Sequence, residues 1–198
     1  MQPVFDTIAE SAARLCDGLF AGVYRYDGTL IHFVAHHNFT EDGLASAQRL
    51  YPRPASHETQ VAAAILDRTV VEVRDFENDP GVPAPSLPLA RALGYRSILV
   101  VPMLREGNPI GAIAVARAGP GAFSVTEVAL LKTFADQAVI AIENVRLFTE
   151  LEARNRDLTE ALEQQTATGD VLRVISQSQT NLQPVFDALI DSGTKLCV

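Results

Sequence analysis

The first segment of this chain occurs a second time near the other end, and this repetition limits how the chain can fold. Residues 2–17 and 183–198 are identical at eight of sixteen positions, at a constant offset of 181. A repeat separated by the length of one domain indicates a tandem array within a longer protein. We therefore predict a domain over residues 1–148, a coiled-coil linker over 149–180, and the first helix of a second, truncated domain over 181–198.

The composition is that of a folded protein and argues against two classes of partner. Hydrophobic residues make up 47% of the chain and charged residues 20%, which is enough for one core. The formal net charge of -8 opposes binding to the phosphate backbone of nucleic acids. No stretch approaches the ~20 apolar residues of a membrane helix. We expect a cytoplasmic protein with no membrane insertion. Cys16 and Cys197 occupy equivalent repeat positions, where a buried thiol is more typical than a disulfide.

Periodicity divides the first domain into short helices and strands. We predict helices at 3–17, 59–66 and 87–93, and strands at 19–26, 29–37, 70–74, 97–105 and 109–116. The first two strands meet at Asp27-Gly28, a pair typical of tight hairpin turns. The last two strands are apolar on both faces, so they should be central strands that are covered on both sides.

A long helix should leave the domain. Ser124 followed by Glu127 resembles a capping box, and helical periodicity then continues through Leu172 without a proline. Its second half has apolar residues at heptad spacing, which favours a parallel homodimer in which this helix and the first helix pair with their copies. The alternative is a single amphipathic helix that lies on its own domain. The expected dimer contacts are Val4, Phe5, Ile8, Phe148, Leu151, Asn155, Leu158 and Leu162.

The polar residues do not form a recognisable catalytic or metal site. His36 and His37 are adjacent on a predicted strand and should point to opposite faces of the sheet, so they cannot hold one ion together. His37 continues the alternating row of Ile31, Phe33 and Ala35 and should lie at the edge of that face. No nucleophile has a plausible base near it in the sequence pattern, so we expect no catalytic residue and no metal in this segment.

Three segments make the chain similar to a known family. They are Gly94–Met103, Pro109–Val115 and Phe134–Leu147, and with the order of elements they resemble the GAF domain, a ligand-sensing module of signalling proteins. The resemblance covers residues 2 to about 148. The following segment, residues 158–168, looks like the connector between tandem GAF domains in bacterial sensor histidine kinases and related cyclases.

Family membership implies an α+β fold and a sensory role. The resemblance implies an antiparallel sheet of five or six strands, with the terminal helices on one face and a small-molecule pocket on the other. It also implies a cytoplasmic module that relays small-molecule or partner binding through a dimeric helical linker to a downstream kinase or cyclase. The alternative within the family is a domain that has lost its ligand and acts as a dimerisation spacer.

Departures from the family narrow the ligand classes. Cyclic-nucleotide-binding members carry an Asn-Lys pair, a Phe and an Asp-Glu pair, where this chain has Arg117-Ala, Phe123 and Glu127-Val, so cyclic GMP or AMP is disfavoured. Bilin-binding members usually attach their pigment through a cysteine near the pocket, which is missing here, so no covalent bilin is expected. A methionine sulfoxide reductase-like enzyme needs cysteines around the pocket and is the least favoured alternative.

If a ligand binds, we expect it between the sheet and the proline-rich loop over residues 75–88. The identity of such a small molecule is unknown from the sequence. An ordinary proline-rich surface loop over a filled core is the alternative. The candidate walls of the site are Phe33, His37, Asp75, Tyr95 and Ser97.

Overall fold

The computed structural model describes residues 2–177, 186–187 and 190. The chain divides into two compact units, Met1–Val145 and Arg146–Val198, and each is described here by itself. The helix predicted over 181–198 lies outside the described residues except at Phe186, Asp187 and Ile190. Within the described part of the chain, no helix combines the length and the apolarity that crossing a membrane requires.

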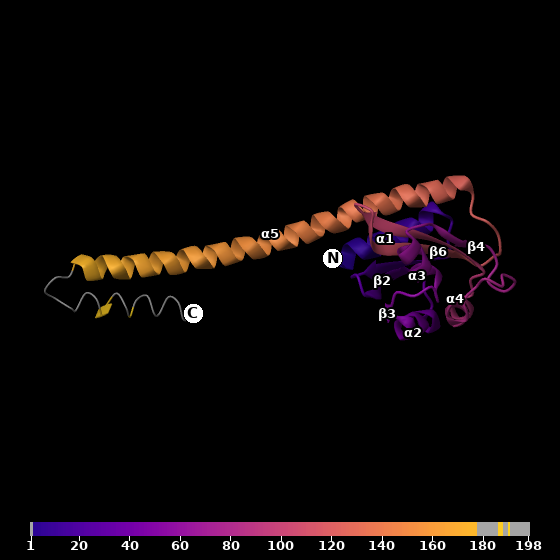
Figure 1. The fold of residues 1–198 in the computed structure, drawn as a ribbon, viewed down its shortest axis with the longest axis horizontal. Helices are drawn as coiled ribbons and strands as arrows, with labels where there is room; N and C mark the ends of the chain where they lie inside the picture. The colour runs from indigo at the N-terminus through magenta and orange to yellow at the C-terminus, as the bar shows by residue number, and fades with distance from the viewer. Residues whose placement is uncertain (1, 178–185, 188–189, 191–198) are drawn as a thin grey trace. The chain divides into compact units, whose positions relative to one another are not determined.

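The first unit is built on one six-stranded antiparallel sheet (Figure 1). The strands are β1 (Phe20–Tyr26), β2 (Leu30–His37), β3 (Arg53–Pro54), β4 (Val71–Val73), β5 (Ser97–Arg105) and β6 (Asn108–Arg117). Their order is β3-β2-β1-β6-β5-β4. The apolar strands β5 and β6 are internal to the sheet, as predicted, and the α+β fold expected from the sequence is confirmed.

The two terminal helices cover one face of the sheet. Helix α1 (Gln2–Leu15) and the first turns of α5 (Val125–Gln177) pack on this face (Figure 1). The capping box begins α5 as predicted: Ser124 N and Oγ each donate to Glu127 Oε2 at 2.8 Å. The side chains buried on this terminal-helix face include Phe5, Ile8, Ala12, Cys16, Leu99, Val101, Ile113, Val115, Leu131 and Ala135. Phe5 and Ile8, two of the expected dimer contacts, are thus buried against the sheet of their own domain.

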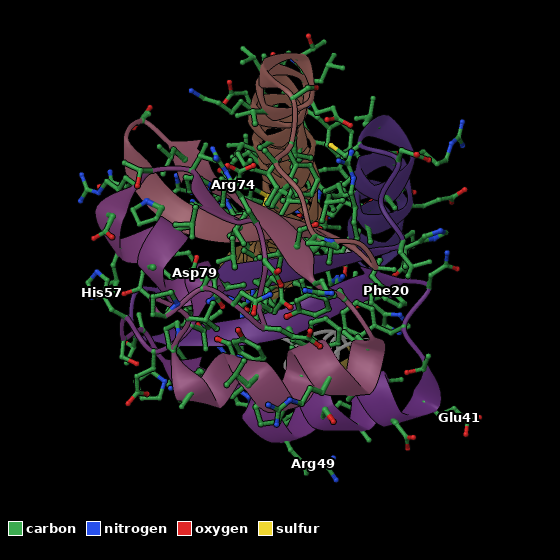
Figure 2. The ribbon with its side chains drawn as sticks, turned by 90° about the vertical axis from the view of Figure 1, so that its right-hand side faces the viewer. Phe20, Glu41, Arg49, His57, Arg74 and Asp79 are labelled. Carbon is green, nitrogen blue, oxygen red and sulfur yellow. The ribbon has the colours of Figure 1, made fainter. Side chains whose placement is uncertain are left out.

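Three helices cover the opposite face. They are α2 (Glu41–Leu50), α3 (Gln60–Asp67) and α4 (Leu87–Leu93), the last preceded by the short 3-10 turn η1 (Ala84–Ser86). Figure 2 shows α2 and α4 next to each other beneath the sheet, with α1 and α5 on its other side. The sequence analysis did not predict α2 or β3. The signal for α2 was present, because the Thr40 side chain accepts from Gly43 N at 3.1 Å and two acidic residues fill the first turn.

A β-bulge in β2 places the last residues of this strand on the opposite face of the sheet from the one that alternation predicts. Val23 pairs with Ala35 but Tyr24 pairs with Phe33, so Val34 is an extra residue. Phe33 therefore faces α2 and α4, whereas Ala35 is buried on the terminal-helix face. The prediction that Phe33, Ala35 and His37 form one row is wrong for this reason.

Candidate functional site

The side of the sheet that faces α2, α3 and α4 is filled by aromatic side chains. The rings of Tyr24 and Tyr51 lie 5.0 Å apart between centroids, and those of Tyr24 and Phe33 lie 5.5 Å apart. The cavity that remains beneath Phe39 and Leu93 has a volume of about 20 Å³. That volume is close to the minimum for a single water molecule. A cavity of this volume has no room for a bilin or a nucleotide.

Three buried tyrosines give this interior a polar character. Burial raises the pKa of Tyr24 and Tyr95 above the ordinary value, and it raises the pKa of Tyr51 to about 12. Their hydroxyls therefore stay protonated at neutral pH and keep their donor capacity. Gly22 allows Tyr24 its position, because a Cβ on Gly22 would stand 3.0 Å from the Tyr24 hydroxyl.

A larger hollow opens at the end of the sheet, beside the proline-rich loop. This sheet-end cleft has a volume of about 580 Å³. Its buried wall includes Phe76 and Tyr95, whose rings meet edge to face at a centroid distance of 5.0 Å. Figure 2 labels Asp79 on the loop that borders it. The lining residues are Phe76, Glu77, Asp79, Pro80, Val82, Leu87, Ala90, Arg91, Gly94, Tyr95, Arg96 and Ala118.

An ion pair anchors the loop at this cleft. Arg96 Nη2 donates to both carboxylate oxygens of Asp75 at 2.8 Å, and its Nε donates to Oδ1 at 3.2 Å. The Arg96 guanidinium, assisted by the Asn78 amide, lowers the pKa of Asp75 from 3.8 to about 2. A backbone hydrogen bond joins the same two segments, because Phe76 N donates to Arg96 O at 2.8 Å. Asp75 thus positions Arg96 and does not itself line the cleft.

The structure brings only some of the predicted site residues together. Tyr95 borders both the interior cavity and the sheet-end cleft, and Phe33 packs in the interior aromatic cluster. Ser97 is fully buried, and its hydroxyl donates to Gly119 O at 2.8 Å. Ser97 precedes Ile98, which faces the interior, so the alternation of β5 directs Ser97 to the terminal-helix face instead. The structure therefore does not join Ser97 to the other candidates.

His36 takes the place that the sequence analysis gave to His37. Its ring stacks on Phe33 at 5.9 Å and contacts Phe39 at 5.1 Å, whereas His37 pairs in register with Ala21 of the terminal-helix face. Within the described residues, His36 Nδ1 is buried without a hydrogen-bond partner. Burial lowers the pKa of His36 below 6.5. The sequence analysis assumed that side chains alternate without interruption along β2 and therefore missed His36. The bulge arises from the pairing of β2 with β1, and local composition does not reveal it.

The residues at the places compared with the cyclic-nucleotide motif meet where α1 and β6 end and α5 begins. The Arg117 guanidinium lies 4.2 Å from the centre of the Phe123 ring, and it also pairs with Glu127. Arg117 Nε further donates to Cys16 O at 3.2 Å. These contacts tie the end of α1, the end of β6 and the start of α5 together. Their arrangement is structural and holds the terminal helices on the sheet.

The fold and sequence comparisons agree. The sequence model of the GAF domain matches residues 1–142. The chain belongs to the GAF domain family. A search of curated proteins gives no match.

Several solved structures are similar to this GAF domain. A domain of a protein described as a two-component sensor histidine kinase from Sinorhizobium meliloti 1021 has a TM-score of 0.59 at 18% identity, covering 74% of this chain and 92% of its own. The PixJ GAF domain of Thermosynechococcus elongatus, in its blue-light absorbing form, has 0.56 at 17%, covering 77% and 90%. The type II free methionine-R-sulfoxide reductase of Thermoplasma acidophilum has 0.56 at 18%, covering 72% and 92%. At these identities the similarity establishes the fold.

The described cysteine is poorly suited to redox catalysis. Cys16 is completely buried on the terminal-helix face, on the opposite side of the sheet from the interior cavity. Burial, together with the charge of Glu127, raises the pKa of this thiol to about 11. A reactive cysteine needs a thiolate at neutral pH. Cys16 is therefore a packing residue.

Proposed function

We propose that this GAF domain is a cytoplasmic regulatory module of a bacterial signal-transduction protein. It relays the binding of a small molecule or a partner through a parallel homodimer to a downstream kinase or cyclase. The proposal rests above all on α5, which is helical over 53 residues and carries an exposed apolar row at heptad spacing. The GAF fold supports a sensory role, and the exposed row supports the dimer.

The exposed row is expensive to leave in water. Phe148, Leu151, Leu158 and Leu162 are 62%, 58%, 61% and 63% exposed. Full burial of one such side chain contributes about 1.5–3 kcal/mol. Pairing of two helices along this row would cover eight such side chains, while Asn155 at an a position would favour two strands in one register. A single unpaired helix would leave this apolar row exposed to water.

The sheet offers a direct route between the interior and the terminal helices. Leu99 is buried against α1 and α5, and the next residue, Val100, is buried on the opposite face with α3. Because interiors are close-packed, a shift of the interior side chains is felt across a layer one residue thick. A ligand needs a difference in affinity of only a few kcal/mol between two packings to shift their populations.

The filled interior supports a second candidate function. With about 20 Å³ of free volume at the face of the sheet, a dimerisation spacer needs no ligand at all. The two candidates share the dimer and differ in the response to small molecules. A change in helix pairing when a ligand binds would favour the relay, and unaltered pairing would favour the spacer.

Light scattering tests the dimer that both candidates need. The chain should have twice its monomer mass, and Leu158→Asp should dissociate it, because the seam would bury an unpaired charge. Ala153→Asp is the matched control, since Ala153 lies at an outer heptad position on the same helix and is exposed. It should remain dimeric. A wild-type mass that stays monomeric at all concentrations would refute the proposal.

A further inference from the structure

The sheet-end cleft carries features of a binding site in its own right. It lies where β4 ends and β5 begins, and Tyr95 is the one residue that its lining shares with the small interior cavity at the face of the sheet. Its volume of about 580 Å³ falls within the range of small-molecule sites, which is about 300–1,000 Å³. Its loop holds Pro80 and is anchored by Arg96 and Asp75, so the walls are largely preorganised.

The charges around the cleft are balanced. Two guanidiniums, Arg91 and Arg96, and two carboxylates, Glu77 and Asp79, line it. A polyphosphate or another pure anion would meet the two carboxylates at close range, and a pure cation would meet the two guanidiniums. The lining therefore suits a ligand that carries both signs of charge and little net charge.

The charged side chains of the cleft differ in whether they already form ion pairs or hydrogen bonds within the protein. Arg96 is paired with Asp75, and its Nη2 also lies 3.4 Å from Glu77. Within residues 2–177, the exposed Arg91 side chain makes no hydrogen bond or ion pair, which leaves its five donors for a ligand. Glu77 is 68% exposed and keeps acceptor capacity. The cleft thus presents one uncommitted cation and one accessible carboxylate.

The uncharged part of the cleft is apolar. The Phe76 and Tyr95 rings are buried side chains with an edge-to-face contact, and Val82, Leu87 and Ala90 continue this surface. Aromatic and aliphatic walls of this kind take up an apolar group of the ligand, while the charged groups fix its orientation.

We propose that the sheet-end cleft binds a small zwitterion with an apolar or aromatic group, the chemistry of a free apolar amino acid. Arg91 receives the carboxylate, Glu77 and Asp79 receive the ammonium, and the apolar group lies against Phe76 and Tyr95. As the input of the relay this site rests on the proposed function, but binding itself does not depend on the dimer. The loop that bears Glu77 would couple the site to β4 and β5.

Calorimetry with four probes tests the charge requirement. The wild-type chain should bind L-phenylalanine at least about tenfold more tightly than L-phenylalaninamide, which lacks the carboxylate, or N-acetyl-L-phenylalanine, which lacks the ammonium. L-leucine serves as an aliphatic second zwitterion. Equal affinity for all three phenylalanine compounds, or no binding of either amino acid, would overturn the proposal.

Two arginine variants test the location. Arg91→Ala should weaken L-phenylalanine binding about tenfold and leave binding of the amide unchanged. Arg49→Ala is the matched control, because Arg49 is an exposed arginine on the neighbouring helix α2 (Figure 2). Equal weakening by both substitutions, or none by Arg91→Ala, would refute the site. In NMR spectra, ligand shifts should centre on Phe76 and Tyr95; shifts confined to α1 and α5 would also refute it.

Failure of this inference can be told apart from failure of the relay. Arg91 lies outside the heptad row, so Arg91→Ala should keep the mass that light scattering gives for the wild type. A monomer that binds L-phenylalanine would refute the dimeric relay and keep the site. A dimer that binds none of the probes would refute the site and keep the relay.

Discussion

Gly43 of α2 lies directly against Leu93 of α4: a Cβ on Gly43 would stand 2.0 Å from Leu93 Cδ2. This contact lets the two helices pack closely over the interior, and Leu93 also borders the small cavity. A residue that is poor for helix formation is thus found where only the smallest side chain fits.

Gly43→Ala should destabilise the domain, although alanine is the better helix former. Leu93 must move, and overpacking of this kind costs about 1–3 kcal/mol. The gain in helix propensity from glycine to alanine is at most about 1 kcal/mol, so the cost of overpacking is the larger of the two. The free energy of unfolding from urea titration measures the effect. Gly119→Ala is the control, because a Cβ there meets nothing within 4 Å. An unchanged midpoint for Gly43→Ala would show that α2 and α4 separate easily.

Neighbouring residues of α3 should differ in their contribution to stability. Ile65 is completely buried, whereas Leu66, one position further on, is 37% exposed. Ile65→Ala should cost about 2–5 kcal/mol, since it removes buried atoms and leaves a cavity. Leu66→Ala should cost clearly less. Thermal or urea unfolding of both variants checks this, and similar losses would mean that α3 packs in another orientation.

The Asp75–Arg96 ion pair should make stability depend on pH in the acid range. Pairing lowers the pKa of Asp75 from 3.8 to about 2, so the folded state favours the carboxylate. The stabilisation is complete above pH 3.8 and is lost as the pH falls towards 2. The difference in urea midpoint between wild type and Asp75→Asn should be constant above about pH 5 and shrink below 3.8. A difference that does not change down to pH 2 would contradict the pairing.

His36 should make the domain less stable below neutrality. Burial is the main cause that lowers its pKa below 6.5; His37 adds to this effect and Asp6 opposes it. The unfolded chain therefore binds a proton more readily, and stability falls as the pH drops below 6.5. His36→Phe keeps an aromatic ring beside Phe33 and removes the titration. Its urea midpoint should change less between pH 7.5 and pH 5 than that of the wild type, and an equal change would contradict the buried position.

Local patterns in the sequence were sufficient for most of the fold. The two apolar runs that became β5 and β6, the hairpin at Asp27-Gly28 and the capping box of Ser124 and Glu127 all depend on residues close in the chain. Helix α2 also had such a signal at Thr40, but its composition is less apolar and it was not predicted. The strand β3 has only two residues and is defined by its pairing with β2. No local sequence pattern therefore predicts it.

The candidate site depended on relationships that no local pattern contains. Phe33 and Tyr95 were predicted near a ligand, and both face the interior. Arg91 and Arg96 were not predicted, because only the folded loop brings them beside Glu77 and Asp79. The filling of the interior likewise results from aromatic side chains contributed by separate strands and loops.

The sequence by itself determined the repeat, most of the element types and the heptad spacing of the apolar row, because periodicity and capping act between residues a few positions apart. Only the tertiary structure decided which face each side chain occupies after the bulge at Val34, and therefore that His36 rather than His37 stacks on Phe33. The physical reason is that strand register is set by pairing between strands, and a shift of one residue reverses every later side chain.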